Sequence, residues 1–413
     1  MKKLEVRLSR EPGEERVIGR LAQTGPRAGG RVVFEYDPAF LQNPLWLSPF
    51  KLPPQPGLFE HRDRAFGPIF GLFDDSLPDG WGLLLMDRFF QQRGSVLAEV
   101  SVLDRLAYLG TRTMGALTYH PPADPGGPEA QALDLHEMAR ASRQVIEGAA
   151  GEVLPQLLRA GGSPGGARPK VLVGVCGDAI LSGEDELPAG YTPWIVKLHA
   201  REDSPDAGAG ELAYSLMARD AGIAMPPTRL FETHQGERFF GVERFDRKGN
   251  HRYHVHTFGN LIHANFRIPS CDYRQLLEVT RILTRNHQDV LESYRRMVFN
   301  VLAHNRDDHV KNFAFRLTDE GSWELAPAYD LVFSPGPGGE HTMTVAGEGR
   351  APGRSHLLQL ADPAGLSNRE ARSILDDVAA AASRWRTHAR QAGVGPKNAK
   401  RIGNAIEECL ARI

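Results

Sequence analysis

The densest polar cluster of this 413-residue chain is His304-Asn305-Arg306-Asp307-Asp308-His309-Val310-Lys311-Asn312. Before it, apolar side chains recur at helical spacing, which predicts an amphipathic helix; they are Val290, Leu291, Tyr294, Met297, Val298, Val301 and Leu302. After it, apolar runs at 313–317 and 323–326 flank a polar turn, which indicates a β-hairpin. The cluster is therefore predicted to be a loop held between rigid elements, a placement that favours function.

The segment Ala328-Tyr329-Asp330-Leu331 follows the second strand of this hairpin. Because a hairpin returns its second strand beside the first, we expect Asp330 to lie near Asn312. Asp307, Asn312 and Asp330 then supply a base and two oxygen ligands. Such ligands suit Mg²⁺, which takes its remaining ligands from water and phosphates.

A Gly-rich run at 161–170 precedes an apolar strand predicted at 171–175. Glycine lets a backbone approach phosphate oxygens closely. The run is not a Walker A motif, because Ala167 stands where that motif requires Lys, and the G-x-G-x-x-G spacing is also absent. By itself this run does not identify a nucleotide site.

Lys197 lies in a second apolar strand, predicted at 194–198. A Lys on a buried strand needs a partner, and the candidate is Glu211, at the start of a helix predicted at about 210–221. A Gly-rich loop, a strand Lys, a helix Glu, an Asp…Asn loop and a returning Asp follow one another in the chain. That order is typical of a protein-kinase-like phosphotransferase.

With these motifs the sequence resembles the HipA family, the serine/threonine kinase toxins of bacterial type II toxin–antitoxin modules. The resemblance covers nearly the whole chain and rests on Leu72–Gly82, Gly165–Lys170, Val242–Arg247, Asn305–Asn312 and Ala328–Leu331. It implies an α+β, two-lobed protein-kinase-like fold. An N-terminal subdomain would occupy 1–120, an N-lobe with the Gly-rich loop 150–247, and a helical C-lobe 248–413.

The resemblance also implies roles for individual residues. Asp307 would be the catalytic base, and Asn312 and Asp330 would bind Mg²⁺. ATP would be held by Ser163, Lys197, Glu243, Phe245 and Lys311, with Glu211 as the ion-pair partner of Lys197. Glu243 and Phe245 would offer backbone groups to adenine. Ser163 matches a loop serine that such kinases autophosphorylate, which ends their activity, although Pro164 beside it departs from the family pattern.

Partners are implied by the same resemblance. Family members phosphorylate aminoacyl-tRNA synthetases, which halts translation and leads to persistence. They bind a small helix-turn-helix antitoxin of the HipB type, so DNA would be reached only through the antitoxin. A cytoplasmic protein without a membrane span is expected. Two other functions stay open: a small-molecule kinase with the same loop, and a largely non-catalytic co-repressor module.

Composition excludes several protein classes. A net charge of −2, 41% hydrophobic residues and 24% charged residues do not fit a disordered chain. The sequence has no uninterrupted apolar run of roughly 18 residues, and near-neutral charge argues against a protein that coats nucleic acid. Three scattered cysteines favour a reducing cytosol over a disulfide framework.

The remaining predictions concern less distinctive segments. The first 119 residues are predicted to form short strands with one helix, at about 83–90, and a long helix is predicted from Ser367 to about Gln391. His251, His254, His256 and His263 do not have the spacing of a zinc finger, so we interpret them as solvated or strand-paired. A basic stretch at 384–401 is interpreted as a solvated helix face.

Overall fold

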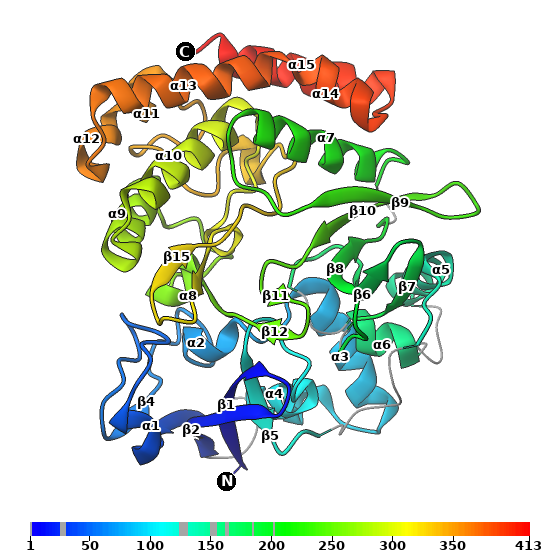
Figure 1. Ribbon diagram of the computed structural model, residues 1–413, viewed down its shortest axis with the longest axis vertical. Helices are drawn as coiled ribbons and strands as arrows, with labels where there is room; N and C mark the ends of the chain where they lie inside the picture. The colour runs from blue at the N-terminus through cyan, green and yellow to red at the C-terminus, as the bar shows by residue number, and fades with distance from the viewer. Residues whose placement is uncertain are drawn as a thin grey trace.

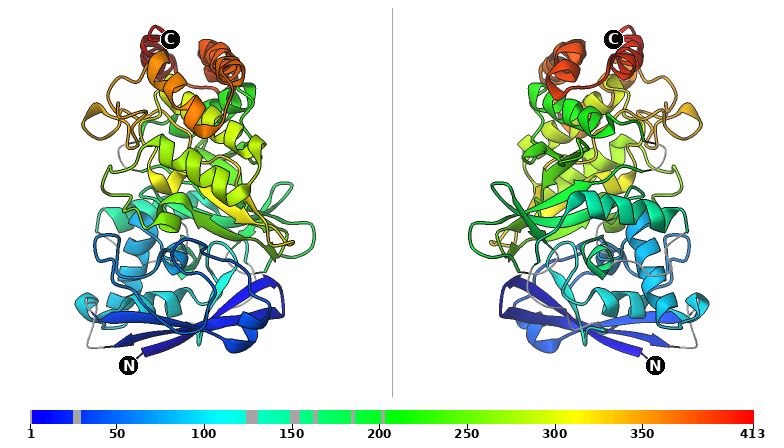
Figure 2. Two further views of the ribbon diagram at one scale, coloured as in Figure 1. Left: turned by 90° about the vertical axis from the view of Figure 1, so that its left-hand side faces the viewer. Right: turned by 90° about the vertical axis from the view of Figure 1, so that its right-hand side faces the viewer.

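The computed structural model describes residues 2–24, 30–123, 131–148, 155–161, 165–183, 186–200 and 203–413. An N-terminal sheet, a central layer and a group of C-terminal helices are stacked along the longest axis (Figures 1 and 2), and the two chain ends lie at opposite ends of this stack. Within the described ranges, no helix combines the length and apolar character that a bilayer span requires.

The N-terminal sheet has the strand order β4-β3-β2-β1-β5, and its neighbours are antiparallel. Its strands are β1 (Lys2–Glu11), β2 (Glu14–Thr24), β3 (Arg31–Tyr36), β4 (Leu58–Glu60) and β5 (Leu117–His120). Along β1, Leu4, Val6 and Leu8 are buried on one face, as their period of two predicts.

The helices of this region are more numerous than the sequence analysis expected. They are α1 (Pro38–Gln42), α2 (Gly71–Asp74), α3 (Gly80–Gln92), the 3₁₀ turn η1 (Leu97–Glu99) and α4 (Val102–Leu109). The single predicted helix lies inside α3. Helix α4 was missed because eight residues give little periodic signal. It is held by a capping box between Ser101 and Asp104 and by packing against β1 and β5.

The second sheet has the order β7-β6-β8-β10-β9. Its elements and neighbours are α5 (Leu135–Ile146), α6 (Pro155–Gly161), β6 (Lys170–Cys176), β7 (Ala179–Ser182), β8 (Thr192–Lys197), α7 (Ala207–Asp220), β9 (Thr228–Glu232) and β10 (Arg238–Glu243). Helix α7 begins three residues before the predicted start. A glycine is needed in its first turn, because a Cβ on Gly208 would lie 2.7 Å from the carbonyl oxygen of Arg238.

The C-terminal half contains the predicted helix and hairpin. These are α10 (His287–Leu302), β14 (Ala314–Leu317) and β15 (Trp323–Leu325), with Phe315 opposite Leu325. The other elements are β11 (Arg247–Lys248), β12 (His251–Arg252), β13 (His254–Thr257), α8 (Phe258–Ile262), α9 (Tyr273–Thr284), η2 (Val310–Asn312), η3 (Pro337–Gly339), α11 (Arg354–Gln359), α12 (Ala361–Ala364), α13 (Asn368–Ser383), α14 (Trp385–Ala392) and α15 (Pro396–Leu410).

The long helix predicted from Ser367 to Gln391 is two helices. Ser367 does cap α13, but the chain turns at Arg384 and continues as α14. The turn buries Trp385, whose indole N–H donates to the carbonyl of Ala399 at 2.8 Å and whose ring lies 5.3 Å from that of Tyr214. Packing of α14 on α7 therefore overrides helical continuity.

Two hydrophobic clusters hold these layers together. The larger joins the N-terminal sheet to the C-terminal helices. In the smaller, Trp81 and Leu85 of α3 pack with Leu157 of α6 and with Val171 and Val173 of β6. The N-terminal region thus shares a core with the second sheet.

Candidate active site

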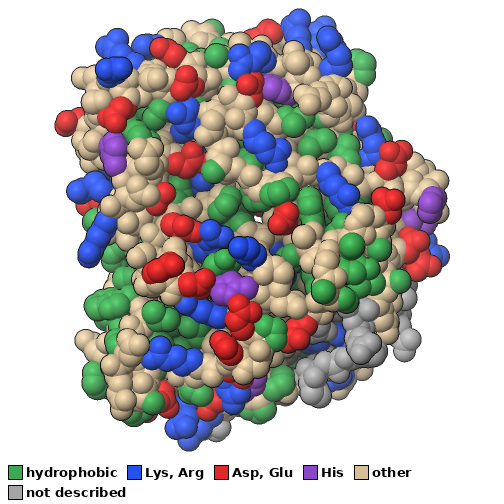
Figure 3. Space-filling view, viewed as in Figure 1, with side chains coloured by type: hydrophobic (Ala, Val, Ile, Leu, Met, Phe, Trp, Pro, Cys, Tyr) green, Lys and Arg blue, Asp and Glu red, His purple; other side chains and the backbone are tan. Residues whose placement is uncertain are grey.

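A cleft lies between the second sheet and the C-terminal half. In Figure 3 the face is hollowed near its centre, where side chains of both charges gather. Asp75, Leu77 and Asp79 of the N-terminal region contribute to its wall. The predicted site residues that line it are Lys197, Glu211, Glu243, Phe245, Lys311, Asn312 and Asp330. Asp307 is not in this lining; its side chain is exposed on the same loop as Asn312.

Lys197 is held between two carboxylates. Its ammonium donates to Glu211 of α7 and to Asp330, which follows β15. The side chains of Lys197 and Glu211 are nearly buried, whereas that of Asp330 is 39% exposed. The structure thus places Lys197 of β8 in direct contact with both Glu211 of α7 and Asp330.

Within the triad of Lys197, Glu211 and Asp330, Lys197 and Asp330 stabilise each other's charged forms. Burial, aided by the charge of Asp330 and opposed by Lys197, raises the pKa of Glu211. Burial alone would lower the pKa of Lys197, but the charges of Asp330 and Glu211 outweigh it and raise the pKa. For Asp330, burial is likewise outweighed by the charges of Lys197 and Lys170, so the pKa of this carboxyl is well below its usual value. A lysine cation and an Asp330 anion therefore face the cleft at neutral pH.

Lys170 is a second cleft lysine that the sequence analysis did not assign. It lies opposite Lys197 in the ladder between β6 and β8 and is 5% exposed. Its ammonium donates to the carbonyl of Gly165, and burial lowers its pKa. The argument applied to Lys197, that a Lys on an apolar strand needs a partner, would also have found Lys170.

The loop before η2 is fixed by the fully buried Asp308. This carboxylate accepts bonds from the hydroxyl of Tyr273, from Nδ1 of His341 and from the backbone N–H of Thr342, each at 2.8 Å. Asn300 extends the network by donating to the Tyr273 hydroxyl at 2.9 Å. Because Asp307 and Asp308 are adjacent in sequence, no local pattern reveals which of them is buried.

Asp307 and Asn312 are joined across this loop. The amide N–H of the Asn312 side chain donates to the backbone carbonyl of Asp307 at 2.7 Å. His309 accepts a bond from the Lys311 backbone N–H at 3.2 Å and so caps η2. Partial desolvation, aided by the charge of Asp330 and opposed by His309, raises the pKa of Asp307.

Glu243 and Phe245 lie where β10 leaves the second sheet. The backbone N–H of Glu243 is already bonded to the carbonyl of Pro227 at 2.9 Å. The ring of Phe245 stacks on Tyr329 with centroids 5.4 Å apart, and the Tyr329 hydroxyl donates to the carbonyl of Lys311 at 2.6 Å. A flat apolar wall thus adjoins the Lys197 triad.

Lys311 is engaged with the N-terminal region. Its ammonium forms an ion pair with Asp74 at 2.9 Å and lies 4.9 Å from the Phe266 ring centroid. Burial would lower the pKa of Lys311, but the charges of Asp74 and Asp75 outweigh it and raise the pKa. The sequence analysis did not assign Asp74, because its partner lies 237 residues later in the chain.

The Gly-rich loop is described from Gly165 onward, so Ser163 and Pro164 lie outside the described residues. The backbone N–H of Gly166 donates to the carboxylate of Asp79. The backbone N–H of Trp81 donates to the carbonyl of Gly166 at 3.1 Å. The backbone N–H and the backbone carbonyl of Gly166 are therefore both bonded to the N-terminal region.

The four histidines considered for zinc all contact the N-terminal region instead. His251 pairs with Glu11 at 2.5 Å, His254 bonds the carbonyl of Leu47 at 2.9 Å, and His256 bonds Asp75 at 2.5 Å and Ser48 at 3.0 Å. His263 accepts the backbone N–H of Gly71 at 3.0 Å. These side chains join the N-terminal region to the C-terminal half.

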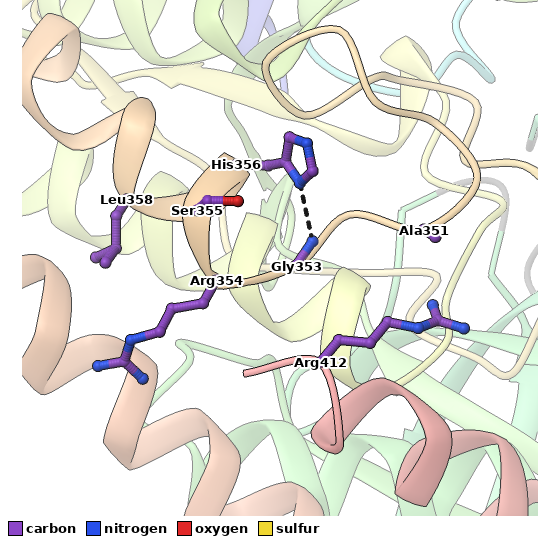
Figure 4. A pocket seen from close by; sticks show the side chains of 7 residues that line it. All are labelled: Ala351, Gly353, Arg354, Ser355, His356, Leu358 and Arg412. Atoms are coloured by element: carbon purple, nitrogen blue, oxygen red, sulfur yellow. Dashed lines mark hydrogen bonds between the residues drawn. The ribbon is translucent and has the colours of Figure 1, made fainter.

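A second pocket lies beside α11, apart from the cleft (Figure 4). It is lined by Ala351, Gly353, Arg354, Ser355, His356, Leu358 and Arg412. His356 accepts the backbone N–H of Gly353 at 3.2 Å, and Arg354 donates to the carbonyl of Ile413 at 3.2 Å. None of the predicted site residues lines this pocket.

Comparison with protein families gives two matches. The model of the HipA N-terminal domain matches residues 13–120, and that of the HipA-like C-terminal domain matches residues 162–385. The second match covers more than half of the chain. The domain boundaries predicted above stay predictions, because a family match does not locate a structural boundary.

Individual relatives agree with these matches. The Sinorhizobium fredii protein named "Putative kinase Y4mE" is 26% identical over 431 residues, covering 96% of this chain and 90% of that protein. "Putative kinase Y4dM" of the same organism is 30% identical over 152 residues, which cover 34% of this chain and only 37% of that protein's length.

A solved structure shows the fold. A chain from the Shewanella oneidensis complex of HipA, HipB and operator DNA superposes with a TM-score of 0.72 at 17% identity, covering 99% of this chain and 96% of that one. The α+β, two-lobed kinase-like fold predicted from the sequence is confirmed.

Proposed function

This chain belongs to the HipA family, and we propose on that premise that it transfers the γ-phosphoryl group of ATP to a serine or threonine hydroxyl of a protein. The observation that carries the proposal is the contact of Lys197 with both Glu211 and Asp330. A lysine flanked by a helix Glu and a metal-binding Asp is the phosphate-binding arrangement of protein kinases.

Nucleotide binding is assigned to the wall beside this triad. The carbonyl of Glu243 and the backbone N–H of Phe245 take the adenine edge, since the N–H of Glu243 is already used by Pro227. Lys197 holds the α- and β-phosphates, and Lys311 adds a cation nearby. A fixed lysine charge in a partly desolvated cleft stabilises phosphate charge more than a solvated one does.

Mg²⁺ is assigned to Asp330 and Asn312. The Asn312 amide donates its N–H to Asp307, which leaves its side-chain oxygen as the available ligand, and Asp330 supplies an anionic oxygen beside Lys197. These oxygen donors fit Mg²⁺, which when bound would neutralise phosphate charge. Asp307, exposed on the same loop, accepts the proton of the attacking hydroxyl.

The substrate and partner are proposed from family membership. The substrate would be an aminoacyl-tRNA synthetase and the partner a helix-turn-helix antitoxin of the HipB type, which makes this chain the toxin of a pair. The solved relative was crystallised with HipB and operator DNA. For this chain, contact with DNA is proposed only through the antitoxin.

The function is tested by incubating the full chain with Mg²⁺ and γ-labelled ATP, together with a panel of purified aminoacyl-tRNA synthetases. We expect label on a serine or threonine of one synthetase, identified by peptide mass spectrometry. A chain in which Lys197 is replaced by Met is the control and should give no label. Transfer to a metabolite mixture alone would instead support a small-molecule kinase. A chain that consumes no ATP under any condition would support the co-repressor module.

Regulation through Ser163 is also proposed. A phosphate there adds about −1.5 to −2 charges next to the glycines that face ATP, so it competes with ATP for the same donors and lowers nucleotide affinity. We expect intact-mass analysis after incubation with Mg-ATP to show one added phosphate at Ser163 and weaker ATP binding by the modified chain. An Asp307→Asn chain treated identically should stay unmodified. An unmodified Ser163 in a chain that is phosphorylating its substrate would rule out this switch.

A further inference from the structure

Residues 74–81 of the N-terminal region contact both sides of the cleft: the C-terminal half and the Gly-rich loop. At the start of this segment, Asp74 pairs with Lys311 at 2.9 Å. Asp75 accepts bonds from the backbone N–H of Thr257 at 2.9 Å, from its hydroxyl at 2.7 Å and from the amide of Asn260 at 2.8 Å. This end of the segment is therefore fixed to the C-terminal half.

The other end of the segment meets the Gly-rich loop. Asp79 accepts the Gly166 backbone N–H, and the Trp81 backbone N–H donates to the Gly166 carbonyl at 3.1 Å. The Trp81 indole N–H donates to the carbonyl of Lys170 at 3.2 Å, and Trp81 itself is 2% exposed. Three hydrogen bonds thus join residues 79–81 to residues 166–170.

Gly80 shows how closely the two backbones approach. Its φ of +43° lies in the region that favours glycine, and a Cβ there would lie 2.5 Å from the Cα of Ala167 and 2.9 Å from the Gly166 carbonyl oxygen. Neither backbone could shift to admit a side chain without breaking the bonds to Gly166. The start of α3 and the Gly-rich loop are therefore fitted to each other.

We propose that Asp79, together with Gly80 and Trp81, positions the Gly-rich loop, so that the N-terminal region sets the nucleotide affinity of a cleft to which it contributes no catalytic group. This inference rests on the proposed function, because it treats the cleft as a nucleotide site. A Gly-rich loop has large backbone freedom, and ordering it on nucleotide binding costs entropy. Hydrogen bonds from the loop to the start of α3 order the loop before the nucleotide binds. Less entropy is then lost on binding, so affinity rises without a new contact to the ligand.

Asp79→Ala in the full chain tests the proposal. It removes a charge-assisted hydrogen bond, so we expect Mg-ATP affinity to fall about tenfold, and KM for ATP to rise while kcat changes little. Hydrogen exchange of the peptide covering 165–170 should become faster even without nucleotide. Asp79→Asn keeps the accepting oxygen, so it should restore most of the affinity and slow the exchange again.

Asp87→Ala is the matched control. Asp87 is also on α3 and forms an ion pair with Arg105 at 2.7 Å, within the N-terminal region and away from the loop. The Asp87→Ala substitution should leave the hydrogen exchange of residues 165–170 and the affinity for a fluorescent ATP analogue unchanged. The proposal would be overturned if residues 165–170 of Asp79→Ala exchanged hydrogen as slowly as in the parent chain. It would also be overturned if Asp79→Ala and Asp87→Ala changed exchange and nucleotide affinity equally.

Two further results keep this inference separate from the proposed function. If the parent chain binds no nucleotide, the proposed function fails, while the exchange experiment still tests whether Asp79 orders the loop. If Asp79→Ala does not fold, as judged by its thermal midpoint, Gly80→Ala provides the second variant. It should weaken analogue binding in a folded chain because its Cβ pushes against Ala167, and unchanged binding would count against the proposal.

Discussion

We expect Asp307→Asn to lose most phosphoryl transfer while the chain still folds and binds Mg-ATP. Asparagine has the same shape as aspartate but cannot accept the proton of the attacking hydroxyl, and loss of a general base typically costs about 10²–10⁴-fold in rate. The loop should survive the change, because Asn312 bonds the backbone carbonyl of Asp307 and not its carboxylate. Asp308, which fixes the loop, is untouched.

Single-turnover transfer from labelled ATP measures this effect, with analogue binding and the thermal midpoint recorded beside it. Asp376→Asn, an exposed acid on α13, is the matched control and should behave as the parent. If Asp307→Asn turns over within a few-fold of the parent, the base is another group.

We expect Asp330→Asn to remove the effect of Mg²⁺ on nucleotide binding. It replaces an anionic oxygen by a neutral one and takes away one of the two carboxylates around Lys197, so we expect transfer to fall by about 10²–10³-fold. Asparagine is the suitable replacement. Asp330 has a φ of +56°, a conformation that Asn adopts more readily than most residues other than Gly, so this replacement adds little backbone strain.

The measurement is nucleotide affinity with and without Mg²⁺. In the parent Mg²⁺ should strengthen binding, whereas in Asp330→Asn it should have little effect. Asn312→Ala should lie between the two, because it removes a neutral ligand. Equal Mg²⁺ stimulation in all three chains would place the metal site elsewhere.

The site elements that could be predicted from sequence are those with a local signature. A lysine in an apolar strand identified Lys197. Two apolar runs on either side of a polar turn identified the hairpin, and the hairpin implied that Asp330 returns to the loop of Asn312. Each of these inferences uses residues within one or two neighbouring elements, where periodicity determines which side chains share a face.

Contacts between segments that are distant in sequence have no local sequence pattern that predicts them. Nothing in the sequence indicates that Asp79 meets Gly166, or that Asp74 meets Lys311. The helix predicted across Arg384 shows the same limit, because the chain turns where Trp385 is buried against Tyr214 and donates to the carbonyl of Ala399, both outside the predicted helix. Propensity and periodicity do not describe such tertiary packing.

The smaller hydrophobic cluster limits how much of this chain can be removed. Trp81 and Leu85 fill a core whose other walls are Leu157, Val171 and Val173. A fragment that kept only the matched C-terminal segment, 162–385, would lose Trp81, Leu85 and Leu157. It would expose β6, the strand that begins at Lys170, and would leave Lys311 without Asp74. We therefore expect the C-terminal segment, although recognisable alone as a sequence unit, not to fold on its own. A minimal version would need a redesigned surface wherever the N-terminal region now lies.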